Sequence, residues 1–129
     1  MEYSVAPNGE RFPIPDEEDY RKEYKRLKEL AERRREEGYQ IVVVMGLGFV
    51  GAVMAGVVAD SLDAETGRPR KFVIGMQRPS PRSFWKIPML NRGISPVKAE
   101  DPEVEPLIAR CVKEKGTLTA TFTYDALKL

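Results

Sequence analysis

The chain has 129 residues with 21 basic and 20 acidic side chains, a formal net charge of +1, one cysteine and no histidine. This size and balance are typical of one globular domain, and we expect no membrane association, because no apolar run is long enough to cross a bilayer and no leader pattern opens the chain. The single Cys111 excludes an internal disulfide and favours a reducing, cytoplasmic setting. Without histidine the chain lacks the commonest metal ligand and general base, so we predict no metal site and no Cys-His nucleophile. Cys111 itself is expected to be a small buried helix residue.

An N-terminal arm is predicted over residues 1–39. Residues 1–15 are expected to be irregular, because they carry several prolines and a Pro-Asn-Gly turn signal at residues 7–9. Asp16 is a plausible N-cap for an amphipathic helix that runs to about Glu37, before a terminating glycine. The apolar stripe of this helix must pack on something, either the rest of its own domain or a second subunit. We predict a homo-oligomer.

The most specific pattern follows the arm. Consecutive β-branched residues predict a buried strand over about residues 40–45, which runs directly into G-x-G-x-x-G at residues 46–51. A small, apolar helix is expected over about residues 49–61. Strand, glycine turn and helix in this order form the context that the dinucleotide-binding fingerprint requires.

Each glycine of the turn has a separate role in this interpretation. Gly46 lets the chain leave the strand sharply, Gly48 leaves room for a pyrophosphate against the backbone, and Gly51 lets the helix pack closely on the strand. The helix start offers free N–H groups and a partial positive charge to the phosphates. The alternative is a glycine-rich turn that binds nothing.

The rest of the chain continues the alternation of strands and helices. Right-handed crossovers then make it a Rossmann-type α/β fold, a parallel sheet with flanking helices that is the first half of a doubly wound fold. Such a half-sheet leaves one edge bare, so either something else covers that edge or residues 40–129 are a truncated dinucleotide-binding domain, and we favour the second. The expected elements are a polar turn over 62–70, a strand over 71–76, a Pro-rich connection over 79–96, a helix over 102–115, a strand over 117–123 and the start of a helix over 124–129.

Basic residues gather in one stretch. Between Thr66 and Ala99 there are eight bases and no acid, which suits an anionic ligand such as a phosphate. The alternative is that these charges pair with acids from elsewhere in the chain. We predict no nucleic-acid partner, because the stretch has few aromatic residues for stacking and no nucleic-acid-binding motif.

Three motifs in order resemble a known family. G-L-G-F-V-G at 46–51, L-N-R-G-I-S-P at 90–96 and G-T-L-T-A-T at 116–121 are similar to the N-terminal portion of the UDP-glucose/GDP-mannose dehydrogenases, the nucleotide-sugar dehydrogenases. The resemblance covers about residues 40–129. It implies an oxidoreductase of the UDP-glucose 6-dehydrogenase kind, which serves polysaccharide biosynthesis and oxidises the sugar C6 hydroxyl to a carboxylate as two NAD molecules are reduced.

The resemblance also implies that cofactor binding and catalysis lie in different parts of such a protein. The family's nucleophilic cysteine lies in a G-G-x-C-x-P-K-D motif that would fall beyond residue 129, and Cys111 does not match it. The chain is therefore implied to carry cofactor binding and no catalytic residue. The nucleotide sugar would be held by a C-terminal domain missing here.

The implied cofactor site departs from the family at one position. Gln77 stands where the family places an acid that holds the adenosine ribose, and a glutamine can bind a ribose hydroxyl without charge assistance. Losing the acid beside Arg78 is the direction expected for accepting a 2′-phosphate, so NAD is the family expectation, NADP is possible, and weakened binding is a third outcome. The implied cofactor-binding residues are Gly46, Leu47, Gly48, Phe49, Val50, Gly51, Gln77, Arg78 and Arg82.

Other classes of function stay open. One is a non-catalytic nucleotide-binding or regulatory module. Another is a subunit-interaction module in which the arm pairs subunits and the glycine turn is vestigial. A methyltransferase-type fold is less favoured, because its glycine loop is usually G-x-G-x-G. Trp85, in a segment without a family counterpart, is expected to be a packed core aromatic.

Overall fold

The computed structural model describes residues 2–98 and 100–129. Its elements in chain order are β1 (Tyr3–Val5), β2 (Arg11–Pro13), α1 (Glu17–Glu36), β3 (Gln40–Met45), α2 (Phe49–Asp60), β4 (Lys71–Met76), α3 (Lys86–Asn91), α4 (Val104–Ala109), the π-helix η1 (Arg110–Lys115), β5 (Leu118–Thr121) and the 3-10 helix η2 (Tyr124–Lys128).

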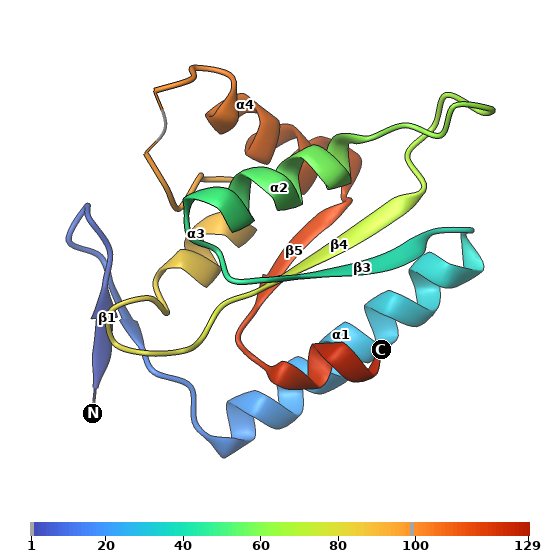
Figure 1. Cartoon of the computed structure of the whole chain (residues 1–129). Coiled ribbons are helices and arrows are strands. Elements are labelled where there is room, and N and C mark those ends of the chain that lie inside the picture. Colours follow the sequence, from blue (N-terminus) through green and yellow to red (C-terminus); the bar gives the residue numbers. More distant parts are fainter. Residues whose placement is uncertain (1, 99) are drawn as a thin grey trace.

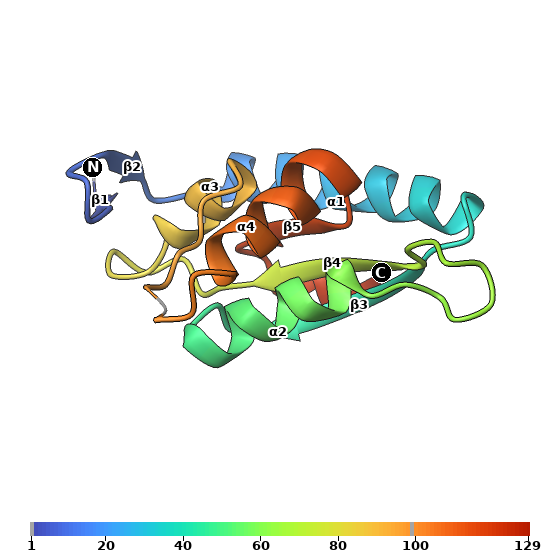
Figure 2. The ribbon, with the colours of Figure 1, turned by 90° about the horizontal axis from the view of Figure 1, so that it is seen from above.

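A parallel sheet of three strands in the order β3-β4-β5 forms the centre of the molecule. Helices α2 and α4 lie above this sheet in Figure 1, and α1 and η2 lie below it. Figure 2 shows from above how α2 follows the direction of the strands. The Rossmann-type α/β class predicted from the sequence is confirmed, and β4 takes the central place that the second strand of a doubly wound fold occupies. No helix within residues 2–98 and 100–129 is long and apolar enough to cross a membrane.

Side chains on the two faces of the sheet form two separate cores. Along β4, Val73 points into the core beneath α2 and α4, whereas Phe72 and Ile74 point into the core beside α1. This alternation follows from the two-residue period of a strand. The sheet is therefore covered on both faces, as a parallel sheet requires.

Helix α2 lies close to its neighbours because its inner face is small. Ala52, Ala55 and Ala59 are fully buried. A Cβ on Gly56 would meet a methyl group of Leu107 at 3.0 Å. The Leu107 side chain of α4 therefore packs directly against the backbone of α2. This packing holds α2 against the sheet and α4.

The predicted arm helix packs on its own domain. A capping box between Asp16 and Asp19 starts α1, and Gly38 follows its end with a φ of +95°. Leu27 and Ala31 are buried within the chain, which is the first of the two alternatives considered for this stripe. Arg26 also reaches the sheet and donates to the carbonyl oxygen of Ala120 at 3.2 Å.

The expectation of an irregular arm before this helix is wrong. Strands β1 and β2 form an antiparallel hairpin, in which Tyr3 pairs with Pro13. The turn predicted at residues 7–9 is the loop of this hairpin, with Gly9 at a φ of +90°. A proline is tolerated here because it sits at the end of a strand with a free edge.

Two further expectations need correction. The Pro-rich connection contains helix α3, whose Pro88 lies in the first turn, where a missing N–H costs no helical hydrogen bond. Trp85 is half-buried rather than packed in the core. Its backbone N–H donates to the Ser4 hydroxyl at 2.9 Å and its indole N–H to the Arg82 carbonyl at 2.9 Å, so it ties the hairpin to the segment before α3.

The edges of the sheet differ in how they are covered. At the β5 edge, the Asn91 side chain accepts from the Ala120 N–H at 2.7 Å and donates to the Ala120 carbonyl at 3.1 Å, much as a neighbouring strand would. Strand β3 forms the other edge, and only β4 pairs with it among the described residues. This edge carries no charged side chain between Gln40 and Met45.

Candidate functional site

The glycine turn stands at the carboxyl end of β3, where α2 begins (Figure 1). Gly46 adopts a φ of +90°, which glycine alone takes without strain, and its N–H donates to the Met76 carbonyl at 2.7 Å. The Leu47 side chain is fully buried and lies over Gly75, where a Cβ would come within 2.7 Å of it. The turn is thus held to the end of β4 by a backbone hydrogen bond and by the packing of the Leu47 side chain.

The remaining glycines have opposite surroundings. A Cβ on Gly51 would lie 1.9 Å from the Gly46 carbonyl oxygen, so the helix start closes tightly on the turn. A Cβ on Gly48 would meet no atom within 4 Å. Open space at Gly48 beside a closed contact at Gly51 is the arrangement that a pyrophosphate lying on the backbone needs, so the residues present fit a dinucleotide.

Free donors line the start of α2. The first helical hydrogen bond runs from the Ala52 N–H to the Gly48 carbonyl at 2.9 Å. The N–H groups of the preceding turn therefore have no helical acceptor. Gly48 provides no side-chain cap and the first turn holds no acid, so these donors and the helix dipole can meet an anion. Phe49 and Val50 are exposed beside them, at 56% and 70%.

Gln77 is bound to the turn itself. Its side-chain oxygen Oε1 accepts from the Leu47 N–H at 2.7 Å, and its backbone N–H donates to the Thr121 carbonyl at 2.9 Å. The ends of β3, β4 and β5 are thereby joined at one point. Spacing alone did not reveal the contact between Gln77 and Leu47, because it depends on the register of β3 and β4.

The basic stretch divides into paired and free arginines. Arg70 pairs with Asp63 at 2.8 Å and Arg92 with Glu10 at 2.6 Å. Arg78 and Arg82, which follow Gln77, are exposed, and neither forms an ion pair within the described part of the chain. Two arginines without an ion pair among the described residues therefore lie just beyond the end of β4.

Other titratable groups have structural roles. Cys111 is fully buried, as expected, and burial raises the pKa of its thiol. The Asp60 carboxylate accepts from Arg110 at 2.8 Å and from Lys115 at 2.7 Å, and these hydrogen bonds, that of Arg110 first, hold its pKa well below the ordinary value. Within residues 2–98 and 100–129, no cluster of three or more histidine, cysteine, aspartate or glutamate side chains could hold a metal ion.

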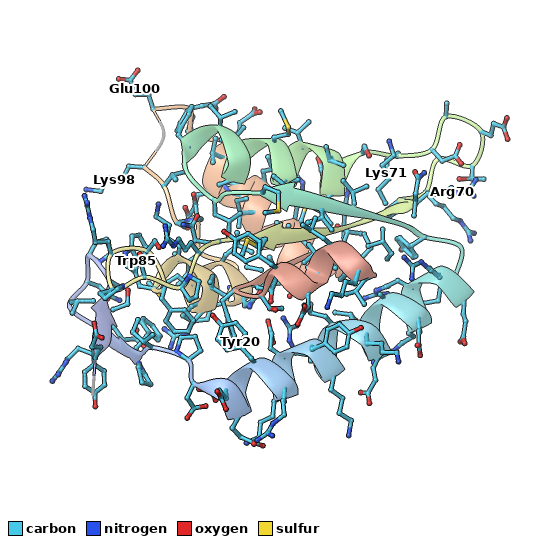
Figure 3. All side chains as sticks on the ribbon, turned by 60° about the horizontal axis from the view of Figure 1, so that its bottom comes forward. Tyr20, Arg70, Lys71, Trp85, Lys98 and Glu100 are labelled. Carbon is cyan, nitrogen blue, oxygen red and sulfur yellow. The ribbon has the colours of Figure 1, made fainter. Side chains whose placement is uncertain are left out.

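One cavity lies at the amino end of the sheet, and a second lies beside β3 and α2 and reaches the glycine turn. The first, of about 630 Å³, is lined by Gly38, Leu62 and Arg70 among others. Figure 3 shows Arg70 and Lys71 at this end and Trp85 at the other. The second, a groove of about 580 Å³, runs along β3 to Gly48 at the carboxyl end. Ligands of open α/β sheets bind outside the carboxyl ends of the strands, so the glycine-turn end is the candidate site.

The fold and this turn define a Rossmann-type α/β unit. No protein-family model matches the chain, and no curated protein matches it. A solved structure does: the NDP-N-acetyl-D-galactosaminuronic acid dehydrogenase from Methanosarcina mazei Go1, at 37% sequence identity and a TM-score of 0.57. The match covers 77% of this chain and 19% of that one. The resemblance to nucleotide-sugar dehydrogenases predicted from the motifs is confirmed, and the match supports a dehydrogenase-like function in general.

Proposed function

We propose that this chain is the portion of a nucleotide-sugar dehydrogenase that binds the nicotinamide dinucleotide, NAD by the family expectation, in an oxidoreductase that converts the sugar C6 hydroxyl to a carboxylate. The observation that carries the proposal is the pair of glycines in the turn. Gly51 is packed against the Gly46 carbonyl, whereas Gly48 faces open space beside unpaired helix N–H groups. The similarity to a solved dehydrogenase supports a nicotinamide dinucleotide as the cofactor.

The turn would hold the cofactor by its backbone. The N–H groups of Phe49, Val50 and Gly51 would donate to the pyrophosphate, and the exposed Phe49 and Val50 side chains would lie over it. Gln77 would meet the adenosine ribose. When bound, the nicotinamide group supplies the hydride acceptor of the oxidation, whereas the groups that activate the sugar would come from the rest of such a dehydrogenase.

The proposal is tested by calorimetric titration of the chain with nicotinamide dinucleotides. We expect saturable binding, and its loss in Gly48→Val, whose branched side chain would fill the space beside the helix start. Ala64→Val is the matched control, because Ala64 is exposed in the turn at the opposite end of the sheet. Failure of the unaltered chain to bind any dinucleotide would refute the proposal.

A subunit-interaction role is the second candidate. The open edge of β3 is uncharged, and the groove beside it is lined by apolar residues of β3 and α2, including the exposed Met45 and Met54. Uncharged edges of this kind pair readily with other strands, and a second copy of this edge is complementary in polarity. Sedimentation equilibrium should then show a dimer that Met54→Glu dissociates and Leu127→Glu, at an exposed site on η2, does not.

A further inference from the structure

We propose that this site prefers a dinucleotide with a 2′-phosphate on its adenosine ribose, and that Gln77 with Arg78 sets this preference. The inference rests on the proposed function and refines it: the family expectation is NAD, and the geometry around Gln77 points to NADP.

The orientation of the Gln77 amide is fixed by its partner. The Leu47 N–H can only donate, so the side-chain atom 2.7 Å from it must be the oxygen Oε1. The amide nitrogen Nε2 is then the free end, and it forms no hydrogen bond within the described part of the chain. Gln77 therefore offers two N–H donors to a ligand at the end of β4.

Donors at this position suit a phosphate better than a diol. A carboxylate here would accept from the 2′-hydroxyl of NAD, which is the usual basis of NAD selection. The free end of Gln77 cannot accept, and it carries no negative charge to repel a 2′-phosphate. A phosphate has only acceptor oxygens toward such a donor, so the exchange of acid for amide favours the phosphorylated ribose.

Arg78 and Arg82 lie on a loop whose backbone is held by hydrogen bonds. The Ser83 hydroxyl donates to the Arg78 carbonyl at 2.7 Å and lies 2.7 Å from the Ser80 hydroxyl, while Trp85 donates to the Arg82 carbonyl. Prolines at positions 79 and 81 further restrict this loop. The backbone between Gln77 and α3 is therefore held without using either guanidinium.

The guanidinium groups of this loop are available to a ligand. Arg70 and Arg92, at either side along the sequence, are already neutralised by acids, whereas Arg78 and Arg82 form no ion pair in residues 2–98 and 100–129. Arginine is suited to phosphate because its planar group can donate to two oxygens at once. A free guanidinium directly after the ribose-binding position is the arrangement found at 2′-phosphate sites.

The test compares ligands that differ only in the 2′-phosphate. The chain is titrated with adenosine 2′,5′-bisphosphate and adenosine 5′-monophosphate, and then with NADP and NAD, at low and moderate salt. We expect the phosphorylated member of each pair to bind roughly tenfold tighter or more, the size of one charge-assisted hydrogen bond. Because the contact is ionic, the preference should shrink as salt is raised.

Single substitutions assign the preference to its residues. Gln77→Glu keeps the length and the Leu47 hydrogen bond but adds an acceptor and a negative charge, so it should reverse the preference toward NAD. Arg78→Ala should weaken NADP binding roughly tenfold more than it weakens NAD binding. Arg68→Ala, an exposed arginine in the turn before β4, is the control for loss of one positive charge and should change neither.

Each outcome decides between the two proposals. Equal binding of NAD and NADP, tighter binding of NAD, or an unchanged preference in Gln77→Glu would overturn this inference and leave the proposed function standing. Binding of none of the four ligands would overturn the proposed function, and the preference with it.

Discussion

Substitutions in the glycine turn should separate its structural requirement from its ligand requirement. In Gly51→Ala the new Cβ would lie 1.9 Å from the Gly46 carbonyl oxygen, while real contacts are at least 3.0 Å, so backbone must move by more than 1 Å. Alanine is the better helix former by about 1 kcal/mol. The clash is with main chain rather than a flexible side chain, so its cost should be about 3 kcal/mol. The cost of the clash exceeds the gain in helix propensity, so we expect a net loss of about 2 kcal/mol in the free energy of unfolding.

Gly48→Ala is the matched variant in the same turn. Gly48 has a φ of −70° and a ψ of −171°, which alanine adopts freely, and its Cβ would meet nothing within 4 Å. It should lose at most about 1 kcal/mol, as for an alanine at an N-cap, yet weaken dinucleotide binding roughly tenfold or more by occupying the ligand space. Urea unfolding followed by the fluorescence of Trp85 and by circular dichroism measures the stabilities. A Gly51→Ala chain as stable as the unaltered one would refute the close approach.

Other regions give three further predictions. Asn91→Ala should lower the free energy of unfolding by about 1–3 kcal/mol in urea titrations, because it removes the acceptor of the Ala120 N–H, whereas the Ala120 carbonyl keeps the hydrogen bond from Arg26. An unchanged free energy of unfolding would show that water replaces the Asn91 amide. The pKa of Asp60 is lower in the folded chain than in the unfolded chain, so on acidification the unfolded chain takes up the proton first. The free energy of unfolding should therefore fall as the pH drops below about 4. Asp60→Asn should lessen this fall and should lower the free energy of unfolding at neutral pH. Thermal unfolding between pH 2 and 7 tests this, and identical pH dependence in both chains would contradict it. Cys111 should react slowly with a thiol reagent until urea unfolds the chain, because it is buried and the pKa of its thiol is raised; rapid labelling of the native chain would contradict its burial.

Local patterns were enough to predict the elements whose residues determine their own structure. The strand over residues 40–45 and the one over 71–76 were placed with their observed ends, because β-branched runs meet glycine or a polar turn at each side. The N-cap at Asp16 and the end of α1 before Gly38 were predictable from their own residues. The chain direction after each strand then follows from right-handed crossovers.

Features that depend on distant contacts were missed. The hairpin of β1 and β2 is held to the domain by the hydrogen bond from Trp85 to Ser4 and by the ion pair of Arg92 with Glu10, which link segments far apart in the sequence. Helix α3 was predicted as a loop because its proline suggested a break, although a proline in the first turn is tolerated. Signals within a few residues carry no information on such contacts.

The candidate site combines both kinds of information. Its glycines could be found from spacing alone, but the reason why Gln77 can replace an acid lies in the structure. Either a glutamine or a glutamate can accept from the Leu47 N–H, so both residues can hold the turn against β4. They differ only in the group left for the ligand, a donor or a charged acceptor. Replacing the amide nitrogen of Gln77 by an oxygen can therefore change the cofactor preference and keep the hydrogen bond from the Leu47 N–H. We accordingly expect Gln77→Glu to unfold at the same urea concentration as the unaltered chain.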